Sequence, residues 1–384
     1  MFDPTLNIII MKKNTLTILS AIFMATTFFA QTVTTYLDGT PDDAMVLDSN
    51  GNLYASNFMG DAVFKFDADG NGVPFITGLN SPNGLAFDSN ENLYICDFYG
   101  VAIYKYDIDG NLLDSFTGII RPSGLIKAFD NDDMIFTNFN ESSVNRLEPD
   151  GTITIISSDP ELNGPVGLAY DENGVLYVGN YNDRKIFRIL NDGTAEYIAQ
   201  LPTDGGATPN LGFIAYGQGR LWGTTMGSDK IFAVNQNEVD SYILFAGSDQ
   251  GSLDGDISQA TFHTPNGIIF NDAEDTMYIT DFGTKNIRII SDVALSVGEE
   301  ILNLKSLQLF PNPAITTLNV RTDVDGDYQL NVYNILGEVV YSMEEKFQNN
   351  SISKNIDIST LGSGVYIVKV STQNITSVKR FIKR

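Results

Sequence analysis

The sequence predicts an all-β chain: a six-bladed β-propeller followed by a small C-terminal β-sandwich. A unit of four short, strand-length runs closed by turn residues recurs six times with a period near forty residues, which is typical of propeller blades. The sixth unit lacks a fourth run. Residues 32–37, ahead of the first unit, form a strand-length run that belongs to none of the six units. Pairing of residues 32–37 with 286–290 would close the ring and remove an exposed edge.

The repeat is followed most easily by a hydrophobic pair in its second strand. In the second unit, residues 84–87, 93–97, 103–106 and 112–117 are the four runs, and Asp, Asn and Gly between them favour hairpin turns. The six predicted marker pairs are Leu53-Tyr54, Leu93-Tyr94, Ile135-Phe136, Leu176-Tyr177, Leu221-Trp222 and Met277-Tyr278.

The chain divides into four segments. Residues 1–30 are predicted to be an upstream extension and a signal peptide, because Met11-Lys12-Lys13 precedes an apolar stretch that ends at Ala30. An uncleaved anchor is the alternative. The propeller is expected over 31–291, a linker over 292–304 and the sandwich over 305–384. No later segment is apolar enough to span a bilayer, so we expect no transmembrane span in the mature protein.

Charge and cysteine content restrict the partners. Residues 31–304 hold 40 acidic and 12 basic side chains, a net formal charge of −28, whereas residues 305–384 carry +2. This large negative charge argues against nucleic acid or an anionic membrane as a partner. The single cysteine, Cys96, excludes an internal disulfide and is expected to be a small buried side chain.

Two motif groups in the repeats carry a family resemblance. PNGLAFDSNENLYICD (82–97) and the sixth unit, with PNGIIF (265–270) and MYITDFGTKNIRII (277–290), resemble the NHL-repeat and gluconolactonase-like propellers. The resemblance covers roughly residues 32–291. It implies the propeller fold, but such propellers include both enzymes and binding modules.

A second resemblance covers the C-terminal block. FPNP (310–313), NILGEVV (334–340), DISTLGSGVYIVKV (357–370) and the terminal KRFIKR resemble, in order and spacing, the type A C-terminal sorting domain of the type IX secretion system. This implies passage through the periplasm and outer membrane, the type IX secretion machinery as partner, and a secreted or cell-surface location. The alternative is an ordinary sandwich domain that stays with the protein.

One end of the propeller channel is predicted to bind ligand. Residues that enter the first strands and residues that leave the second strands gather there, and aromatics follow most of the second-strand exits. Exposed rings beside polar tips favour recognition, although the rings could instead pack between blades. The predicted ligand-binding residues are Phe58, Phe98, Phe139, Tyr181, Phe282 and His263.

Oxygen-rich side chains at the same end suggest a metal. The first-strand entries are Asp43, Asn83, Ser123, Val166, a residue near Asn210, and Asn266; the exits are Asn57, Asp97, Asn138, Asn180, Thr225 and Asp281. Ca²⁺ or another hard divalent cation could be held by Asp43, Asn83, Asp97, Asn138 and Asn266. The alternative is that Asn and Asp cap turns at strand ends. We interpret Asp254-Gly255 as a further Asp-Gly turn.

Two functions are left open. A monomeric binding module for a small molecule, glycan or peptide, with no catalytic residue, is preferred. The alternative is a metal-dependent lactonase-like hydrolase, which would polarise a carbonyl and activate water. The gluconolactonase-like resemblance implies a metal held by Glu, Asn and Asp side chains, but only Asn83 and Asn266 match. Asp43 stands where a Glu is expected, and no Pro-Asp-Gly is present.

Overall fold

The structure is a computed structural model that describes residues 31–39, 41–67, 70–203, 210–293, 308–322, 327–334, 339–345, 352–371 and 376–384. Every regular element among these residues is a β-strand, which confirms the all-β prediction. None of them lies in a helix long and apolar enough to cross a membrane. The predicted signal peptide and residues 294–304 of the predicted linker lie outside the described part of the chain.

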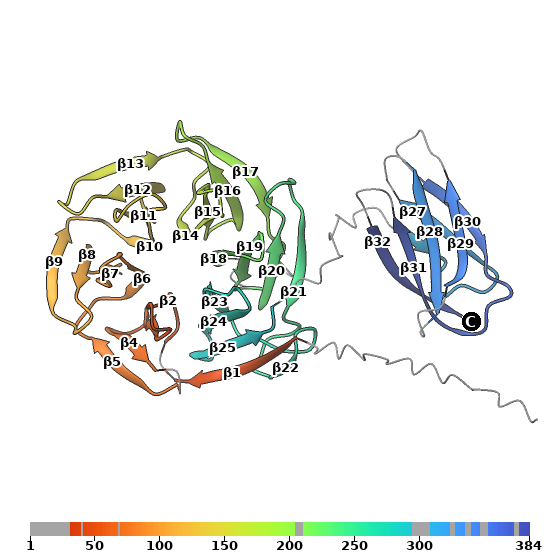
Figure 1. Cartoon of the computed structure of the whole chain (residues 1–384), viewed down its shortest axis with the longest axis horizontal. Helices are drawn as coiled ribbons and strands as arrows, with labels where there is room; N and C mark the ends of the chain where they lie inside the picture. The colour runs from red at the N-terminus through yellow and green to blue at the C-terminus, as the bar shows by residue number, and fades with distance from the viewer. Residues whose placement is uncertain are drawn as a thin grey trace, which may run out of the picture. The chain divides into compact units, whose positions relative to one another are not determined.

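Six antiparallel sheets stand in a ring around a central channel and confirm the six-bladed propeller (Figure 1). Each of the first five blades is built from four strands consecutive in sequence. Blade one is β2 (Met45–Leu47), β3 (Leu53–Ser56), β4 (Val63–Phe66) and β5 (Gly72–Ile76). Blade two is β6 (Pro82–Phe87), β7 (Leu93–Asp97), β8 (Ala102–Tyr106) and β9 (Leu112–Thr117). Blade three is β10 (Pro122–Lys127), β11 (Met134–Asn138), β12 (Ser143–Leu147) and β13 (Ile153–Ser157).

The next two blades repeat this order. Blade four is β14 (Pro165–Tyr170), β15 (Leu176–Asn180), β16 (Lys185–Ile189) and β17 (Ala195–Gln200). Blade five is β18 (Leu211–Gly217), β19 (Arg220–Thr225), β20 (Lys230–Val234) and β21 (Tyr242–Ala246).

The sixth blade is closed by the N-terminal strand. It contains β23 (Pro265–Phe270), β24 (Thr276–Asp281) and β25 (Asn286–Ser291). Strand β1 (Thr32–Asp38) pairs antiparallel with β25, from Val33 opposite Ile290 to Asp38 opposite Asn286. The predicted closure is confirmed, and the two ends of the propeller are joined through one sheet.

A short strand that the sequence interpretation missed lies outside β1. Strand β22 (Gly255–Asp256) pairs with Thr32 and Val33, so the sixth sheet has five strands. The Asp254 carboxylate accepts hydrogen bonds from the Thr35 amide at 3.0 Å and from the buried Arg288 guanidinium at 2.7 Å. The predicted Asp-Gly turn therefore links β1 to β25 through the Asp254 side chain. Breaking a charged hydrogen bond to a buried arginine would cost much of the stability gained here.

Strand register corrects one marker pair. Tyr54, Tyr94, Tyr177 and Trp222 are fully buried at equivalent positions of the second strands. In the third blade Ile135 faces Ile126, as Tyr94 faces Ala86. The equivalent pair is therefore Met134-Ile135, and the predicted Ile135-Phe136 was wrong by one residue, because three apolar residues in a row hide the register.

The first strands approach one another closely around the channel. A Cβ on Gly124 would lie 1.8 Å from the Val166 carbonyl oxygen of the next blade, so glycine is required there. Register places Gly84, Gly167 and Gly267 at the same level, with Ala44 in blade one. In blade five this level carries Phe213.

The C-terminal residues form two further sheets around a separate core, as the sandwich prediction requires. One sheet has β26 (Gln308–Phe310), β27 (Thr317–Thr322) and β30 (Ile352–Asp357). The other has β28 (Tyr328–Asn334), β29 (Val339–Glu345), β31 (Gly364–Ser371) and β32 (Thr376–Lys383). Alternate residues of β31 point inward, with Tyr366, Val368 and Val370 buried and Val365 and Ile367 exposed, which is the pattern of a sheet with one solvated face.

Candidate ligand-binding site

An inner ring of side chains surrounds one end of the channel. Each member stands one residue before the glycine level of its blade: Asp43, Asn83, Ser123, Val166, Gly212 and Asn266. The fifth entry, expected near Asn210, is therefore Gly212. Five of these residues, all except Gly212, line one cavity of about 360 Å³.

Three polar atoms of the inner ring have no partner. Asp43 Oδ2, Asn83 Oδ1 and Ser123 Oγ are buried, and none forms a hydrogen bond with the described residues. The three side chains are only 3%, 6% and 0% exposed. A buried polar group without a hydrogen bond costs about 1–3 kcal/mol of stability. Three such groups from adjacent blades at one cavity indicate that the cavity is built for an occupant.

The one carboxylate in the inner ring is held in an unusual state. Asp43 accepts a hydrogen bond from the Asn266 amide, and burial, together with the neighbouring Asp42, raises the pKa of Asp43 well above its ordinary value. Burial also raises the pKa of Asp42 to about 6. The Asp42 carboxylate accepts the Phe58 amide at 2.7 Å and lies 3.7 Å from Lys285 Nζ. Burial therefore favours the protonated form of Asp43, and a cation in the cavity would favour the ionised form.

An outer ring of large apolar side chains stands above the inner ring. Its members come within two residues of the ends of the second strands: Phe58, Phe98, Phe139, Tyr181, Met226 and Phe282. In blades two to six their amide N–H groups donate to the carbonyl of the residue before the first strand (Phe98 to Ser81, 3.1 Å; Phe139 to Arg121, 3.1 Å; Tyr181 to Gly164, 2.9 Å; Met226 to Asn210, 3.0 Å; Phe282 to Thr264, 3.1 Å). This repeated hydrogen bond fixes each side chain over the channel.

Four of the rings touch in sequence. Phe58, Phe98, Phe139 and Tyr181 form a chain of edge-to-face contacts with centroid distances of 5.4, 5.7 and 5.8 Å. The Arg121 guanidinium lies over the Tyr99 ring at 4.0 Å. Arg146, Arg188 and Arg288 pair with carboxylates, whereas no described carboxylate pairs with Arg121. The mouth thus combines an aromatic wall with one unneutralised cation.

The structure divides the predicted site residues into two groups. The cavity is lined by all five predicted aromatics (Phe58, Phe98, Phe139, Tyr181 and Phe282) and by Asp43, Asn83 and Asn266 from the predicted metal set. The predicted residues Asp97, Asn138 and His263 do not line it.

The second group forms hydrogen bonds outside the cavity. Asp97 accepts the Asn80 amide at 2.8 Å, and Asn138 exchanges hydrogen bonds with Glu141. The His263 amide donates to Asp281 at 2.7 Å, and burial raises the pKa of Asp281 to about 7. Asn138 thus caps the turn after its strand, whereas the Asp97 and Asp281 carboxylates each bind the segment that leads into the first strand of their blade.

Sequence reasoning missed four lining residues: Tyr99, Arg121, Asn140 and Met226. Met226 could have been found, because it follows the exit Thr225 as the aromatics follow theirs. Arg121 precedes a first strand and has a positive φ of 55°, a backbone conformation that cannot be predicted from the sequence alone.

The fold is that of a six-bladed propeller with a cavity on its channel axis. Residues 122–301 match the family described as SMP-30/Gluconolactonase/LRE-like region, and residues 308–384 match the Secretion system C-terminal sorting domain. The chain thus combines a gluconolactonase-like propeller with a secretion sorting domain, and both resemblances are confirmed. The NHL-repeat designation stays a prediction. Among curated proteins, no sequence matches the chain.

Solved structures share the propeller. An auxiliary nutrient binding protein from Bacteroides ovatus is 17% identical over 68% of this chain and 77% of its own, with a TM-score of 0.56. Virginiamycin B lyase from Staphylococcus aureus is 14% identical over 67% and 98%, with a TM-score of 0.52. A gluconolactonase from Xanthomonas campestris is 20% identical over 68% and 89%, also with a TM-score of 0.52. At these identities the likeness is one of fold alone.

Proposed function

We propose that the protein is an exported binding module whose ligand occupies the cavity between the inner and outer rings. The observation that carries this proposal is the set of three unpartnered buried atoms, on Asp43, Asn83 and Ser123, beneath an aromatic wall. A ligand that hydrogen-bonds to them would recover free energy that the empty protein lacks. A solved neighbour named as a nutrient binding protein supports the same class of function.

The lining points to a ligand with both a flat apolar face and polar edges. Aromatic rings provide large, rigid contact area, while Ser123 can donate or accept and Asp43 offers a free carboxyl oxygen. Arg121 adds a cationic donor at the wall. A sugar or a small aromatic molecule fits this combination better than a purely aliphatic one.

Ser123→Ala tests the proposal without a folding penalty. Because Ser123 Oγ has no partner, removing it should leave the melting temperature unchanged or slightly raised. A panel of monosaccharides, sugar acids and dipeptides would be screened by ligand-observed NMR. We expect hits for the parent to bind about twofold to tenfold more weakly to Ser123→Ala. Hits whose affinity is changed neither by this substitution nor by Phe282→Ala would place binding elsewhere and refute the proposal.

A second function has its own support. Asp43 Oδ2 and Asn83 Oδ1 are free acceptors beside Asn266, and a hard cation favours such oxygens. A bound divalent ion would supply Lewis-acid chemistry for lactone or ester hydrolysis. These three side chains would hold it, with Asp43 ionised. No group of three or more His, Cys, Asp or Glu side chains in the described part of the chain could hold a metal, so amide oxygens would have to complete the site.

Elemental analysis separates the two functions. The protein would be purified from a calcium-containing buffer, and its metal content compared with that of Asn83→Ala and Asn266→Ala. One ion per chain in the parent, lost in both variants, would favour the hydrolase. A metal-free parent would remove the main support for hydrolysis.

We also propose export by the type IX route to the cell surface or the medium. The match of residues 308–384 to a secretion sorting domain supports it. The terminal strand β32 pairs along its whole length with β31, so its loss should unfold the sandwich. Deletion of residues 378–384 should trap the protein in the periplasm, detected by fractionation and immunoblotting. Normal appearance of the truncated protein outside the cell would contradict the assignment.

A further inference from the structure

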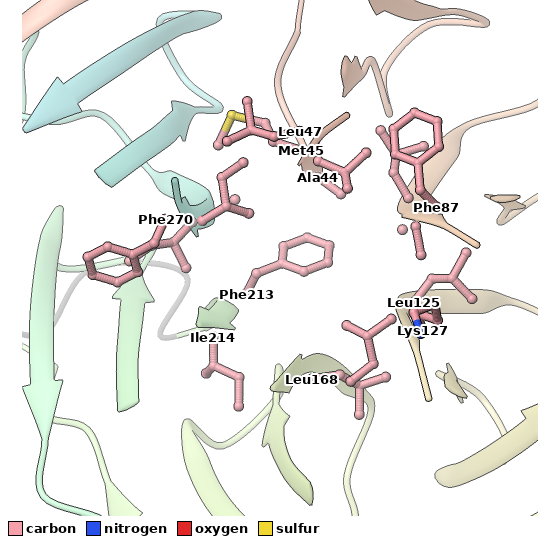
Figure 2. Close-up of a pocket in the computed structure, with 18 of the residues that line it drawn as sticks. Ala44, Met45, Leu47, Phe87, Leu125, Lys127, Leu168, Phe213, Ile214 and Phe270 are labelled. Carbon is pink, nitrogen blue, oxygen red and sulfur yellow. The ribbon is translucent and has the colours of Figure 1, made fainter. Parts of the chain in front are cut away.

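The opposite end of the channel contains a second cavity, of about 370 Å³ (Figure 2). Its wall is formed by the residues that follow the glycine level, and the position next to the glycine is aliphatic in all six blades: Met45, Leu85, Leu125, Leu168, Ile214 and Ile268. The Phe213 ring projects into the middle of this space, with Phe87 and Phe270 at its sides (Figure 2). The aliphatic and aromatic side chains of this wall offer contact area to an apolar group.

Few charged side chains lie at this cavity, and they differ in whether they already have a hydrogen-bond or ion-pair partner. Lys127 and Asp272 line it, and an adjoining pocket adds Glu274. Lys127 Nζ is already bonded to the Asn131 carbonyl at 3.2 Å and lies 3.8 Å from Asp132. Glu274 accepts the Gln218 amide. The carboxylate of Asp272 has no hydrogen bond or ion pair with any described residue.

The hairpins at this end reinforce the sign of the charge. They carry Glu91, Asp171 and Glu172, together with Asp48 and Asp88, which pair with Lys65 and Lys105, and residues 31–304 have a net formal charge of −28. An anionic head group entering here would meet repulsion, whereas a cation would be attracted and concentrated. The apolar wall favours an apolar group, and the unpaired carboxylate favours a positive charge. Together they favour a molecule that has both.

We propose that this cavity binds a small hydrophobic cation, an alkyl or aryl group that carries an ammonium, with Asp272 as its counter-ion. The apolar part lies against the aliphatic ring and Phe213, and the ammonium stays at the solvated rim. This site is distinct from the aromatic mouth, with which it shares no lining residue.

A chain-length series tests the apolar part. Primary alkylammonium ions from butyl- to decylammonium would be titrated into the purified protein by calorimetry. Affinity should rise by about fourfold per methylene until the cavity is full, because each buried methylene contributes about 0.8 kcal/mol. Phe213→Ala enlarges the space at a position where blade one already has Ala44, so it should move this plateau to longer chains. An affinity independent of chain length, or a plateau that Phe213→Ala leaves in place, would refute the site.

A charge series tests the counter-ion. Octylammonium should bind more tightly than octanoate, and Asp272→Asn should weaken octylammonium by about twofold to fivefold, as expected for a solvated ion pair. Asp275→Asn is the matched control, because this carboxylate lies on the same turn, is bonded to Asn271 and does not line the cavity. Equal binding of octylammonium and octanoate, or equal losses in both variants, would overturn the preference for cations.

Discussion

The two ends of the channel are made by the same six strands but differ in how uniform they are. One residue after the glycine level, all six blades present Met, Leu or Ile. One residue before it, they present Asp, Asn, Ser, Val, Gly and Asn. Aliphatic uniformity is what ring packing demands of every blade. The side chains one residue before the glycine level differ from blade to blade, so the mouth presents different polar groups around its axis and can recognise an asymmetric ligand.

The glycine level between the two ends gives the largest expected effect. Gly124→Ala would bring a Cβ to within 1.8 Å of the Val166 carbonyl oxygen, so the blades must separate. We expect a loss of more than about 3 kcal/mol in the free energy of unfolding, measured by denaturant titration. Phe213→Ala, at the same level, leaves the backbone contacts in place and should cost less than Gly124→Ala. Similar losses for the two variants would mean that this level does not fix the ring.

The aromatic mouth should separate into structural and binding members. Phe98 is 7% exposed and packs edge-to-face on Phe58, Tyr99 and Phe139. Phe98→Ala should therefore cost about 2–3 kcal/mol of stability. Phe282 is half-buried, with no ring contact among the described aromatics, so Phe282→Ala should cost under about 1 kcal/mol. Chemical denaturation compares them, and a larger loss for Phe282→Ala would contradict the division.

The acidic pair at the mouth predicts a pH effect. The pKa of Asp42 is raised to about 6, and the pKa of Asp43 is raised well above its ordinary value. The folded state therefore favours the protonated forms of both. The stability they contribute is complete below about pH 4 and is lost as the pH rises through 6. Asp43→Asn should thus match the parent at pH 4 and be the more stable of the two at pH 8.

Thermal melts across this range provide the measurement. Asp275→Asn is a useful control, because hydrogen bonds from Asn271 and Thr276 lower the pKa of Asp275 and the sign reverses. That variant should lose stability relative to the parent as the pH rises through 4. A pH-independent difference for Asp43→Asn would contradict a raised pKa of the buried Asp43.

Much of the fold could be predicted because blades repeat. Six copies reveal strand positions that one copy would not, and the surplus strand at residues 32–38 could be matched to the incomplete blade. The register of the strands was harder to predict from the sequence. Met134, Ile135 and Phe136 are all apolar and buried, so their period does not show which one faces the neighbouring blade.

The site was predictable in part for the same reason. The aromatics were found by their place after each exit, but Asp97 and Asn138 were grouped with the inner ring because a turn cap and a cavity ligand use the same side chains. Arg121 and the apolar cavity depend on tertiary geometry. The ring contacts of Arg121 and the intrusion of Phe213 follow from backbone angles and a bulged register that the sequence does not display.

The most direct test of the proposed binding site is a crystallographic fragment screen of the protein, with sugars, sugar acids and small aromatic alcohols soaked into the crystals. We predict that fragments gather in the aromatic mouth, with polar atoms within hydrogen-bond distance of Ser123 Oγ, Asn83 Oδ1 or Asp43 Oδ2. Fragments that bind only at the outer faces of the blades, with water alone at these three atoms, would contradict the proposal that the mouth is a ligand site.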